Sequence, residues 1–201
     1  MRLVLLTLGA YLVGAIPASY LAAWLKGIDL RQHGSKNLGA TNVYRVLGWR
    51  YALPVALFDV AKGVVPVLFF ARWGGVRWEW FPAVLGAAAV VGHVFSPFVG
   101  FKGGKGVATA AGVFLVLAPL AVLITVPVWA MSLWLTGYVS LSSLIAAAAL
   151  PILVAATGAG RPAVVAGIVL ALMIVYTHRG NIRRLLAGTE SRFRTRKQAA
   201  G

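Results

Sequence analysis

Residues 107–136 read VATAAGVFLVLAPLAVLITVPVWAMSLWLT and contain no charged side chain. As one α-helix this stretch would be about 45 Å long, whereas the hydrocarbon core of a bilayer is only about 30 Å thick. Pro119 lies inside it, and a proline removes one helical hydrogen bond and strains the preceding turn. The stretch therefore predicts two membrane helices with a break near Ala118.

The composition of the whole chain agrees with a membrane environment. Of its 201 residues, 60% are hydrophobic and 11% are charged, and the mean hydropathy is +0.86. Soluble domains have about 45–50% apolar and about 25% charged residues, so this chain lacks the charges that solvate a water-exposed surface. A soluble globular protein is therefore excluded.

Five further apolar stretches are candidate membrane helices: 3–25, 51–70, 81–101, 138–156 and 163–177. The first is too long for the apolar region of a signal peptide and has no convincing cleavage site of small residues, so we expect it to be retained. Together with the two halves of 107–136, these stretches predict seven spans. The expected fold is an all-α integral membrane protein, a seven-transmembrane-helix bundle with short cytosolic active-site loops. It forms a single domain over residues 1–201, with a basic tail over about 192–201.

Positive charge is distributed unequally between the two sides that this topology defines. With seven spans, the loops after the first, third and seventh span emerge on the same side. The cations on that side are Lys26, Arg31, Lys36, Arg45, Arg50, Lys102, Lys105, Arg179, Arg183, Arg184, Arg192, Arg194, Arg196 and Lys197. The opposite side has Arg2, Arg72, Arg77 and Arg161, and Lys62 lies inside a span. Because cytoplasmic loops are enriched in lysine and arginine, we expect the N-terminus outside and the C-terminus and the site in the cytosol.

Several kinds of chemistry are excluded by residues that are missing or rare. The chain has no cysteine, which excludes disulfides, thiolate nucleophiles, zinc-thiolate sites and iron–sulfur clusters. Its four acidic residues are too few for an acid-rich metal cage, so we expect no metal site and no cofactor. The net charge of +15 suits anionic lipid head groups or phosphorylated substrates. We expect no nucleic acid partner, because the basic residues border spans rather than form a solvated patch with stacking aromatic residues.

The first of three polar segments, residues 34–42, reads GSKNLGATN and is followed by Arg45. Glycines let backbone N–H groups turn toward an anion, and short hydroxyl and amide side chains add donors. A helix that starts near Asn42 would also favour negative charge. An ordinary glycine-rich interfacial loop is the alternative. The candidate binding residues are Ser35, Lys36, Asn37, Gly39, Thr41, Asn42 and Arg45.

The second segment, residues 101–109, reads FKGGKGVAT and lies between the third and fourth spans. Lys102 and Lys105 supply positive charge, and Gly103 and Gly104 permit close approach of a phosphate to backbone N–H donors. The P-loop spacing G-x-x-x-x-G-K-[ST] is not met, so no nucleotide site is inferred. A lysine pair that ends a membrane span is the alternative.

The third segment, residues 178–190, reads HRGNIRRLLAGTE. In a helix, His178 and Asn181 share one face. An interfacial amphipathic helix explains the arginines and leucines but not these two residues. In the second span, Asp59 and Lys62 can form an ion pair, which lowers the cost of each charge in the membrane. For Lys62, both a structural ion pair and a phosphate-ligand role are open.

These three segments, in this order and at these span ends, resemble the bacterial membrane acyl-phosphate:glycerol-3-phosphate acyltransferases. The resemblance covers the whole chain and rests on three long motifs, GSKNLGATNVYR (34–45), GHVFSPFVGFKGGKGVAT (92–109) and HRGNIRRLLAGTE (178–190). The segment LFDVAKG (57–63) is also similar to the family.

The resemblance implies transfer of the acyl group from acyl phosphate to the 1-hydroxyl of sn-glycerol 3-phosphate. The products would be 1-acyl-glycerol 3-phosphate (lysophosphatidic acid) and phosphate, in the first acylation step of bacterial phospholipid synthesis. It also implies the bacterial cytoplasmic (inner) membrane, contact with membrane lipid, and no coenzyme A or acyl carrier protein as direct donor. One observation agrees independently: in the H-x-x-x-x-D pair of thioester-using glycerolipid acyltransferases, the aspartate positions hold Leu38, Phe98 and Arg183 here.

We hypothesise that the catalytic residues are Ser35, Lys105, His178 and Asn181. Arg45 and Lys105 would hold phosphate, helped by backbone N–H groups of the two glycines before Lys105. His178 and Asn181 would orient the glycerol hydroxyl or stabilise the oxyanion. His178 is the candidate general base, and a phosphate oxygen of a substrate is the alternative. The other binding candidates are Lys36, Asn37, Gly39, Thr41, Asn42, Lys62, His93, Lys102, Gly103, Gly104 and Glu190.

Two other functions are compatible with these residues. A membrane transporter for phosphate or phosphorylated small molecules would also place a basic site in a helical bundle, although no internal repeat is visible. A nonenzymatic scaffold would account for the basic tail and the hydrophobic bulk. In the acyltransferase, we expect the acyl chain to lie between apolar spans and to enter sideways from the inner leaflet.

Overall fold

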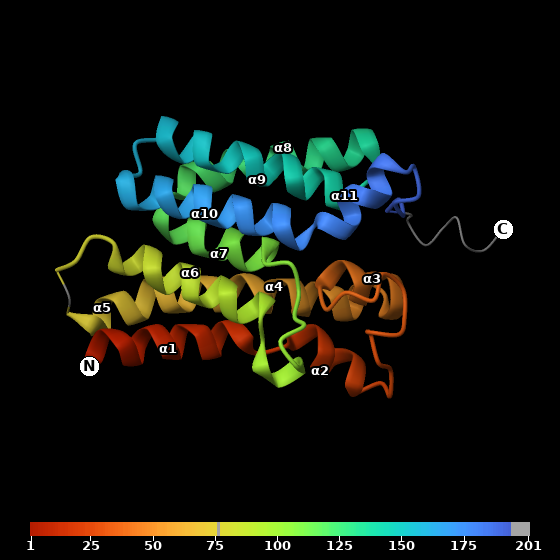
Figure 1. Ribbon diagram of the computed structural model, residues 1–201, viewed down its shortest axis with the longest axis horizontal. Helices are drawn as coiled ribbons and strands as arrows, with labels where there is room; N and C mark the ends of the chain where they lie inside the picture. Colours follow the sequence, from red (N-terminus) through yellow and green to blue (C-terminus); the bar gives the residue numbers. More distant parts are fainter. Residues whose placement is uncertain (76, 194–201) are drawn as a thin grey trace.

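The computed structural model describes residues 1–75 and 77–193, and all regular structure in these ranges is helical (Figure 1). The elements are α1 (Arg2–Ala15), α2 (Ala18–Trp24), α3 (Ala40–Leu47), α4 (Trp49–Val65), the π-helical turn η1 (Pro66–Phe70), α5 (Ala71–Gly74), α6 (Phe81–Val94), the 3₁₀ turn η2 (Pro97–Val99), α7 (Val107–Leu117), α8 (Pro119–Thr136), α9 (Val139–Ala156), α10 (Arg161–Thr177) and α11 (Arg179–Leu186). The prediction of an all-α fold is confirmed. Of the expected basic tail, residues 194–201 lie outside the described ranges.

Five helical segments of the described chain are long and apolar enough to cross a membrane: Arg2–Trp24, Trp49–Gly74, Phe81–Val99, Pro119–Thr136 and Val139–Ala156. α10 and α11 are bent by 59° relative to each other and would add a sixth if the pair crosses as one span. α7 has 11 residues and is about 16 Å long, roughly half the thickness of the hydrocarbon core. Length and composition therefore support five or six crossings, and the seventh stays a prediction.

Two prolines interrupt membrane segments. Only Ala118 separates α7 from α8, and its φ of −152° and ψ of 68° are not helical, so the break predicted there is confirmed. Ile16 and Pro17 separate α1 from α2, a break that the sequence pattern did not predict. Proline has no N–H, so carbonyl groups at the end of α1 must find donors outside their own helix.

Most of the interior of the bundle is apolar, and its helices are closely packed. Phe114 and Leu170 belong to the main cluster, which joins α6 to α10, and Val43 belongs to a second cluster around α2, α3 and α4. Large apolar side chains also cover the outside, where Trp134 is 79% and Leu172 is 66% exposed. Such a surface is suited to lipid rather than to water.

Small residues hold α4 and α7 in close contact. A Cβ atom on Gly63 of α4 would collide with the carbonyl of Thr109 in α7, and one on Gly112 of α7 would collide with the carbonyl of Val60 in α4. Glycine allows this approach because it has no side chain. The pairing fixes the start of α7, which begins two residues after Lys105.

The polar loops gather at one end of the bundle. α2, α3 and α11 lie together at this end, whereas α5 and the turn between α9 and α10 lie at the opposite end (Figure 1). The loop before α3, the loop before α7 and the segment around α11 carry the three polar segments of the sequence. The structure therefore brings together segments that are separated by more than 50 residues in the chain.

Candidate active site

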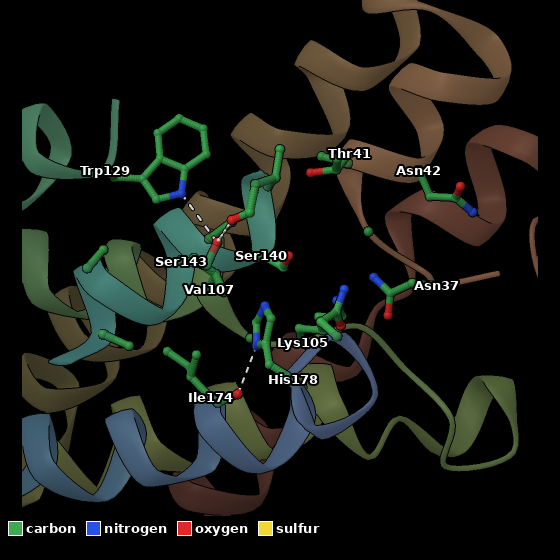
Figure 2. Close-up of a pocket in the computed structure, with 18 of the residues that line it drawn as sticks. Asn37, Thr41, Asn42, Lys105, Val107, Trp129, Ser140, Ser143, Ile174 and His178 are labelled. Atoms are coloured by element: carbon green, nitrogen blue, oxygen red, sulfur yellow. Dashed lines mark hydrogen bonds between the residues drawn. The ribbon is translucent and has the colours of Figure 1, made fainter. Parts of the chain in front are cut away.

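One cavity of about 580 Å³ collects residues from all three polar segments (Figure 2). Its loop end, which we call the chamber, is lined by Ser35, Asn37, Thr41, Arg45, Lys105, His178, Asn181 and Glu190. The cavity continues into the bundle as an apolar part, which we call the groove, lined by Ala110, Ala111, Val122, Val126, Ala146, Ala147 and Leu150. Of the predicted site residues, all line the cavity except Lys62, Lys102, Gly103 and Gly104.

Lys105 supplies the central cation of the chamber. It precedes α7, and its Nζ donates a hydrogen bond to Oδ1 of Asn181. Burial lowers the pKa of the Lys105 ammonium to about 8; Glu190 opposes this shift, and Arg184 and Arg45 add to it. An anion bound beside Lys105 would stabilise its charged form.

Glu190 connects three residues at the edge of the chamber. Its Oε1 accepts hydrogen bonds from Asn181 Nδ2 and Ser140 Oγ, both at 2.6 Å, and its Oε2 accepts one from Arg184 Nε at 2.7 Å. Burial raises the pKa of this carboxyl, but these hydrogen bonds outweigh that effect and hold it below its usual value. Glu190 therefore lines the chamber and holds the Asn181 amide, and its predicted role in binding substrate stays a prediction.

His178 is 2% exposed and lies between α10 and α11. Its Nδ1 is 2.8 Å from the carbonyl oxygen of Ile174. A carbonyl can only accept a hydrogen bond, so Nδ1 carries the hydrogen and Nε2 is the basic nitrogen of the neutral ring. Figure 2 shows this second nitrogen directed toward Ser140 and Ser143. The geometry therefore suits the predicted general base.

The first polar segment lies opposite Lys105. Figure 2 shows Asn37 and Thr41 directed into the chamber. Asn42 has another role: its Oδ1 accepts from Ser35 N at 2.8 Å, and its Nδ2 donates to the carbonyls of Leu30 at 3.3 Å and His33 at 3.1 Å. Because both ends of the Asn42 amide are used within the loop, this residue shapes the loop, which corrects its prediction as a direct ligand.

Arg45 faces the chamber from α3 and contacts the chain that follows Glu190. Its Nη2 donates to the carbonyl of Ser191 at 3.4 Å, and the neighbouring Tyr44 ring stacks on Phe193 with centroids 4.9 Å apart. Phe193 N donates to the carbonyl of Gly137 at 2.6 Å. The segment after Glu190 thus closes one side of the chamber.

The predicted phosphate-binding role of Gly103 and Gly104 is wrong. Gly103 N donates to the carbonyl of Val94 at 2.9 Å, and Gly104 N donates to that of His93 at 3.1 Å. These N–H groups are therefore occupied within the protein. Lys102 is exposed and outside the cavity lining, so of the two lysines in this segment only Lys105 lines the chamber.

Lys62 is a structural cation, which corrects its prediction as a phosphate ligand. Its Nζ is 2.8 Å from Asp59 Oδ1 and donates to the carbonyl of Ile16 at 3.0 Å, and its side chain is 2% exposed. Asp59 also lies 3.6 Å from Nδ1 of His93. His93 lines the cavity next to this pair.

Comparison with known proteins agrees with this site. Residues 4–188 match the family model described as glycerol-3-phosphate acyltransferase. The chain belongs to this family. A glycerol-3-phosphate acyltransferase of Geobacter sulfurreducens is 50% identical and covers 94% of this chain and 97% of its own length. Its counterpart in Desulforudis audaxviator is 48% identical, with coverages of 96% and 98%.

Two solved structures share the fold along essentially the whole chain. Both are crystal structures of PlsY (YgiH), an integral membrane glycerol 3-phosphate acyltransferase. The glycerol 3-phosphate form has a TM-score of 0.93 and 39% identity and covers 100% of both chains. The lysophosphatidic acid form has a TM-score of 0.88 and 40% identity and covers 97% of both chains.

These matches confirm three expectations for the family member described here: a helical fold, a multi-pass integral membrane protein and an acyltransferase enzyme. They do not favour the transporter alternative.

Sequence reasoning missed the contribution of α8 and α9 to the cavity. Ser143 Oγ donates to the carbonyl of Val139 at 2.8 Å and accepts from Trp129 Nε1 at 3.2 Å. Ser140 lies one turn earlier and donates to Glu190. The signal was the run SLSS at 140–143, three serines in an otherwise apolar span, which are costly in lipid unless they face the protein interior.

Proposed function

We propose that this family member transfers an acyl group from acyl phosphate to the 1-hydroxyl of sn-glycerol 3-phosphate, releasing lysophosphatidic acid and phosphate. The observation that carries the proposal is the continuity of the cationic chamber with the apolar groove in one cavity. An acyl phosphate has a phosphate at one end and a hydrocarbon chain at the other, and it needs both environments. The solved relative has glycerol 3-phosphate and lysophosphatidic acid forms, which correspond to acceptor and product.

The groove provides room for the acyl chain. Alanines dominate its walls on α7 and α9, and small side chains leave space between closely packed helices. Val126 of α8 lines the groove and is also 53% exposed on the outside of the bundle. This side chain marks the point at which we expect the acyl chain to enter from the bilayer.

The chemistry requires mainly correct positioning. The acceptor hydroxyl oxygen attacks the carbonyl carbon of the acyl phosphate, and the bond from this carbon to the phosphate oxygen breaks. Phosphate leaves with the electron pair, and the hydroxyl proton goes to His178 Nε2 or to a phosphate oxygen. Lys105 and Arg45 neutralise the phosphates, while Asn181 and Ser35 orient the reacting groups.

Acyl phosphate is the direct donor in this proposal, in place of a coenzyme A or acyl carrier protein thioester. The protein would lie in the bacterial cytoplasmic membrane with seven crossings, its N-terminus outside and the chamber in the cytosol. Two observations support this topology. α1 begins at the end of the bundle opposite α11, as an odd number of crossings requires (Figure 1). The chamber end also carries most of the lysines and arginines.

The proposal is tested with purified protein in lipid vesicles. Phosphate release from palmitoyl phosphate is followed with and without glycerol 3-phosphate, beside a Lys105→Ala variant and a palmitoyl-coenzyme A arm. We expect release that requires both substrates, yields lysophosphatidic acid and collapses in the variant. Folded protein that shows no acceptor-dependent release, or that prefers the thioester, would contradict the proposal.

A further inference from the structure

The broken first span ends on a buried polar cluster that the proposed reaction does not use. At the end of α1, the Ala15 carbonyl accepts a hydrogen bond from Ser96 Oγ at 2.6 Å, and the Ile16 carbonyl accepts one from Lys62 Nζ at 3.0 Å. The break at Pro17 makes outside donors necessary. Lys62 is thereby fixed to the backbone of the first span.

From Lys62 the cluster continues to His93. Asp59 Oδ1 lies 2.8 Å from Lys62 Nζ and 3.6 Å from His93 Nδ1. Asp59 and Lys62 are each 3% exposed and His93 is 8% exposed. A buried ion pair is costly to assemble and contributes little net stability, so its presence here suits a role in placing other groups.

The opposite edge of the His93 ring contacts the loop that carries Lys105. A Cβ atom on Gly104 would collide with Nε2 of His93 on one side and with the carbonyl of Leu38 on the other. The Gly104 N–H also donates to the His93 carbonyl at 3.1 Å. The residue directly before Lys105 is therefore fixed by the side chain and the backbone of His93.

We propose that Asp59, Lys62 and His93 are positioning residues that set the location of the Lys105 ammonium in the chamber by holding Gly104 against the His93 ring. The inference rests on the proposed function of the chamber. Lys62 anchors Asp59, and the Asp59 carboxylate acts on the Nδ1 edge of the ring through its charge, across 3.6 Å and without a hydrogen bond. The ring in turn fixes the position of the loop. The Nζ end of the Lys105 side chain donates a hydrogen bond to Asn181, which in turn is held by its hydrogen bond to Glu190.

The test compares His93→Gln and Asp59→Asn with two controls in the full-length protein. Ser96→Ala removes a neighbouring anchor of the same helix break without touching Asp59 or His93. His33→Gln makes the same change at an exposed histidine outside the cavity. For each variant, thermal unfolding, kcat, KM for glycerol 3-phosphate and the pH profile of kcat/KM are measured with palmitoyl phosphate as donor.

A displaced loop would both weaken catalysis and expose the Lys105 ammonium to water. We expect kcat/KM at pH 7 to fall about 10- to 100-fold in His93→Gln, with a smaller fall in Asp59→Asn. We assign the fall of kcat/KM at alkaline pH to loss of the Lys105 proton. This fall should begin at higher pH in both variants, because an ammonium that is more exposed to water keeps its proton to higher pH. Ser96→Ala should lower thermal stability and leave the alkaline fall of kcat/KM at the same pH. His33→Gln should change neither property.

The outcomes separate this inference from the proposed function. Absence of acceptor-dependent release in the wild-type protein would reject the function itself. If folded His93→Gln or Asp59→Asn has the same kcat and KM as the wild type, and its kcat/KM falls at the same alkaline pH, only the positioning role is rejected. If neither variant yields folded protein, the cluster holds the fold rather than Lys105, and the positioning role is also rejected.

Discussion

Asn181 Nδ2 donates a hydrogen bond to Oε1 of Glu190 at 2.6 Å, and the other end of the same amide accepts one from Lys105 Nζ. The amide therefore has a single orientation, because only its nitrogen can donate to the carboxylate and only its oxygen can accept from the ammonium. Through this amide, an acidic residue near the end of the described chain influences a lysine in the middle of it.

Replacing Glu190 by glutamine should disturb this amide. The neutral side chain loses the charge-assisted bonds to Arg184 and Asn181, so Asn181 is free to turn. We expect kcat/KM to fall about 10- to 100-fold with most of the folded protein retained. Glu79→Gln, at an exposed acid outside the cavity, is the matched control. Equal activity of the two variants would show that Glu190 does not position the site.

The rate should decline at alkaline pH because of Lys105. Its ammonium has a pKa of about 8, so it is charged below this pH and becomes neutral above it. We expect kcat/KM for glycerol 3-phosphate to fall with a slope of about tenfold per pH unit above pH 8. In Lys105→Arg the guanidinium stays charged, so the decline should move beyond pH 10, whatever the absolute rate. A decline that stays near pH 8 in this variant belongs to another group.

His178→Gln should reduce kcat more than it changes KM. Glutamine can still donate to the Ile174 carbonyl, but it has no basic nitrogen in place of Nε2. We expect a loss of about 100-fold or more, within the range for a lost general base. Near-normal turnover with an unchanged pH profile would instead assign the proton to a phosphate oxygen of the substrate.

Gly104→Ala should inactivate the enzyme, whereas Gly180→Ala should not. The added methyl group at Gly104 would overlap His93 and the Leu38 carbonyl, while at Gly180 it would meet only Arg184 Nη1 at 3.6 Å. Gly180 lies in α11, where alanine is the better helix former. Activity and thermal unfolding are measured for both variants. Normal activity of Gly104→Ala would contradict the close packing of this loop against His93.

Ala147→Leu should shorten the groove. Ala147 is buried and lines it, whereas Ala148 is exposed and does not. The larger side chain should lower the preference for palmitoyl phosphate over lauroyl phosphate by at least about tenfold, because each misfit methylene costs about 1–3 kcal/mol. Ala148→Leu should keep the original preference. An unchanged preference in both would place the acyl chain elsewhere.

Predictions from the sequence were most accurate where a residue changes the conformation of the backbone next to it. The helix break predicted beside Pro119 is present at Ala118, although Pro54, Pro127 and Pro151 lie inside helices that continue through them. The equivalent effect of Pro17 was missed because the apolar pattern continues across it. Lys105 and Lys102 look alike in the sequence, but only Lys105 lines the chamber. Backbone hydrogen bonds to the carbonyls of His93 and Val94 hold the two glycines between these lysines and so fix the direction of the loop.

The sequence by itself determined the membrane class, the helical fold and the three segments that make the chamber, because hydropathy and proline geometry are local properties of the chain. Only the tertiary structure decided which polar groups are available to a substrate. Lys62 and the N–H groups of Gly103 and Gly104 are occupied by partners, and Glu190 is paired by residues from α9 and α11. Whether a donor or a charge is free depends on what packs against it, and those partners come from distant parts of the chain.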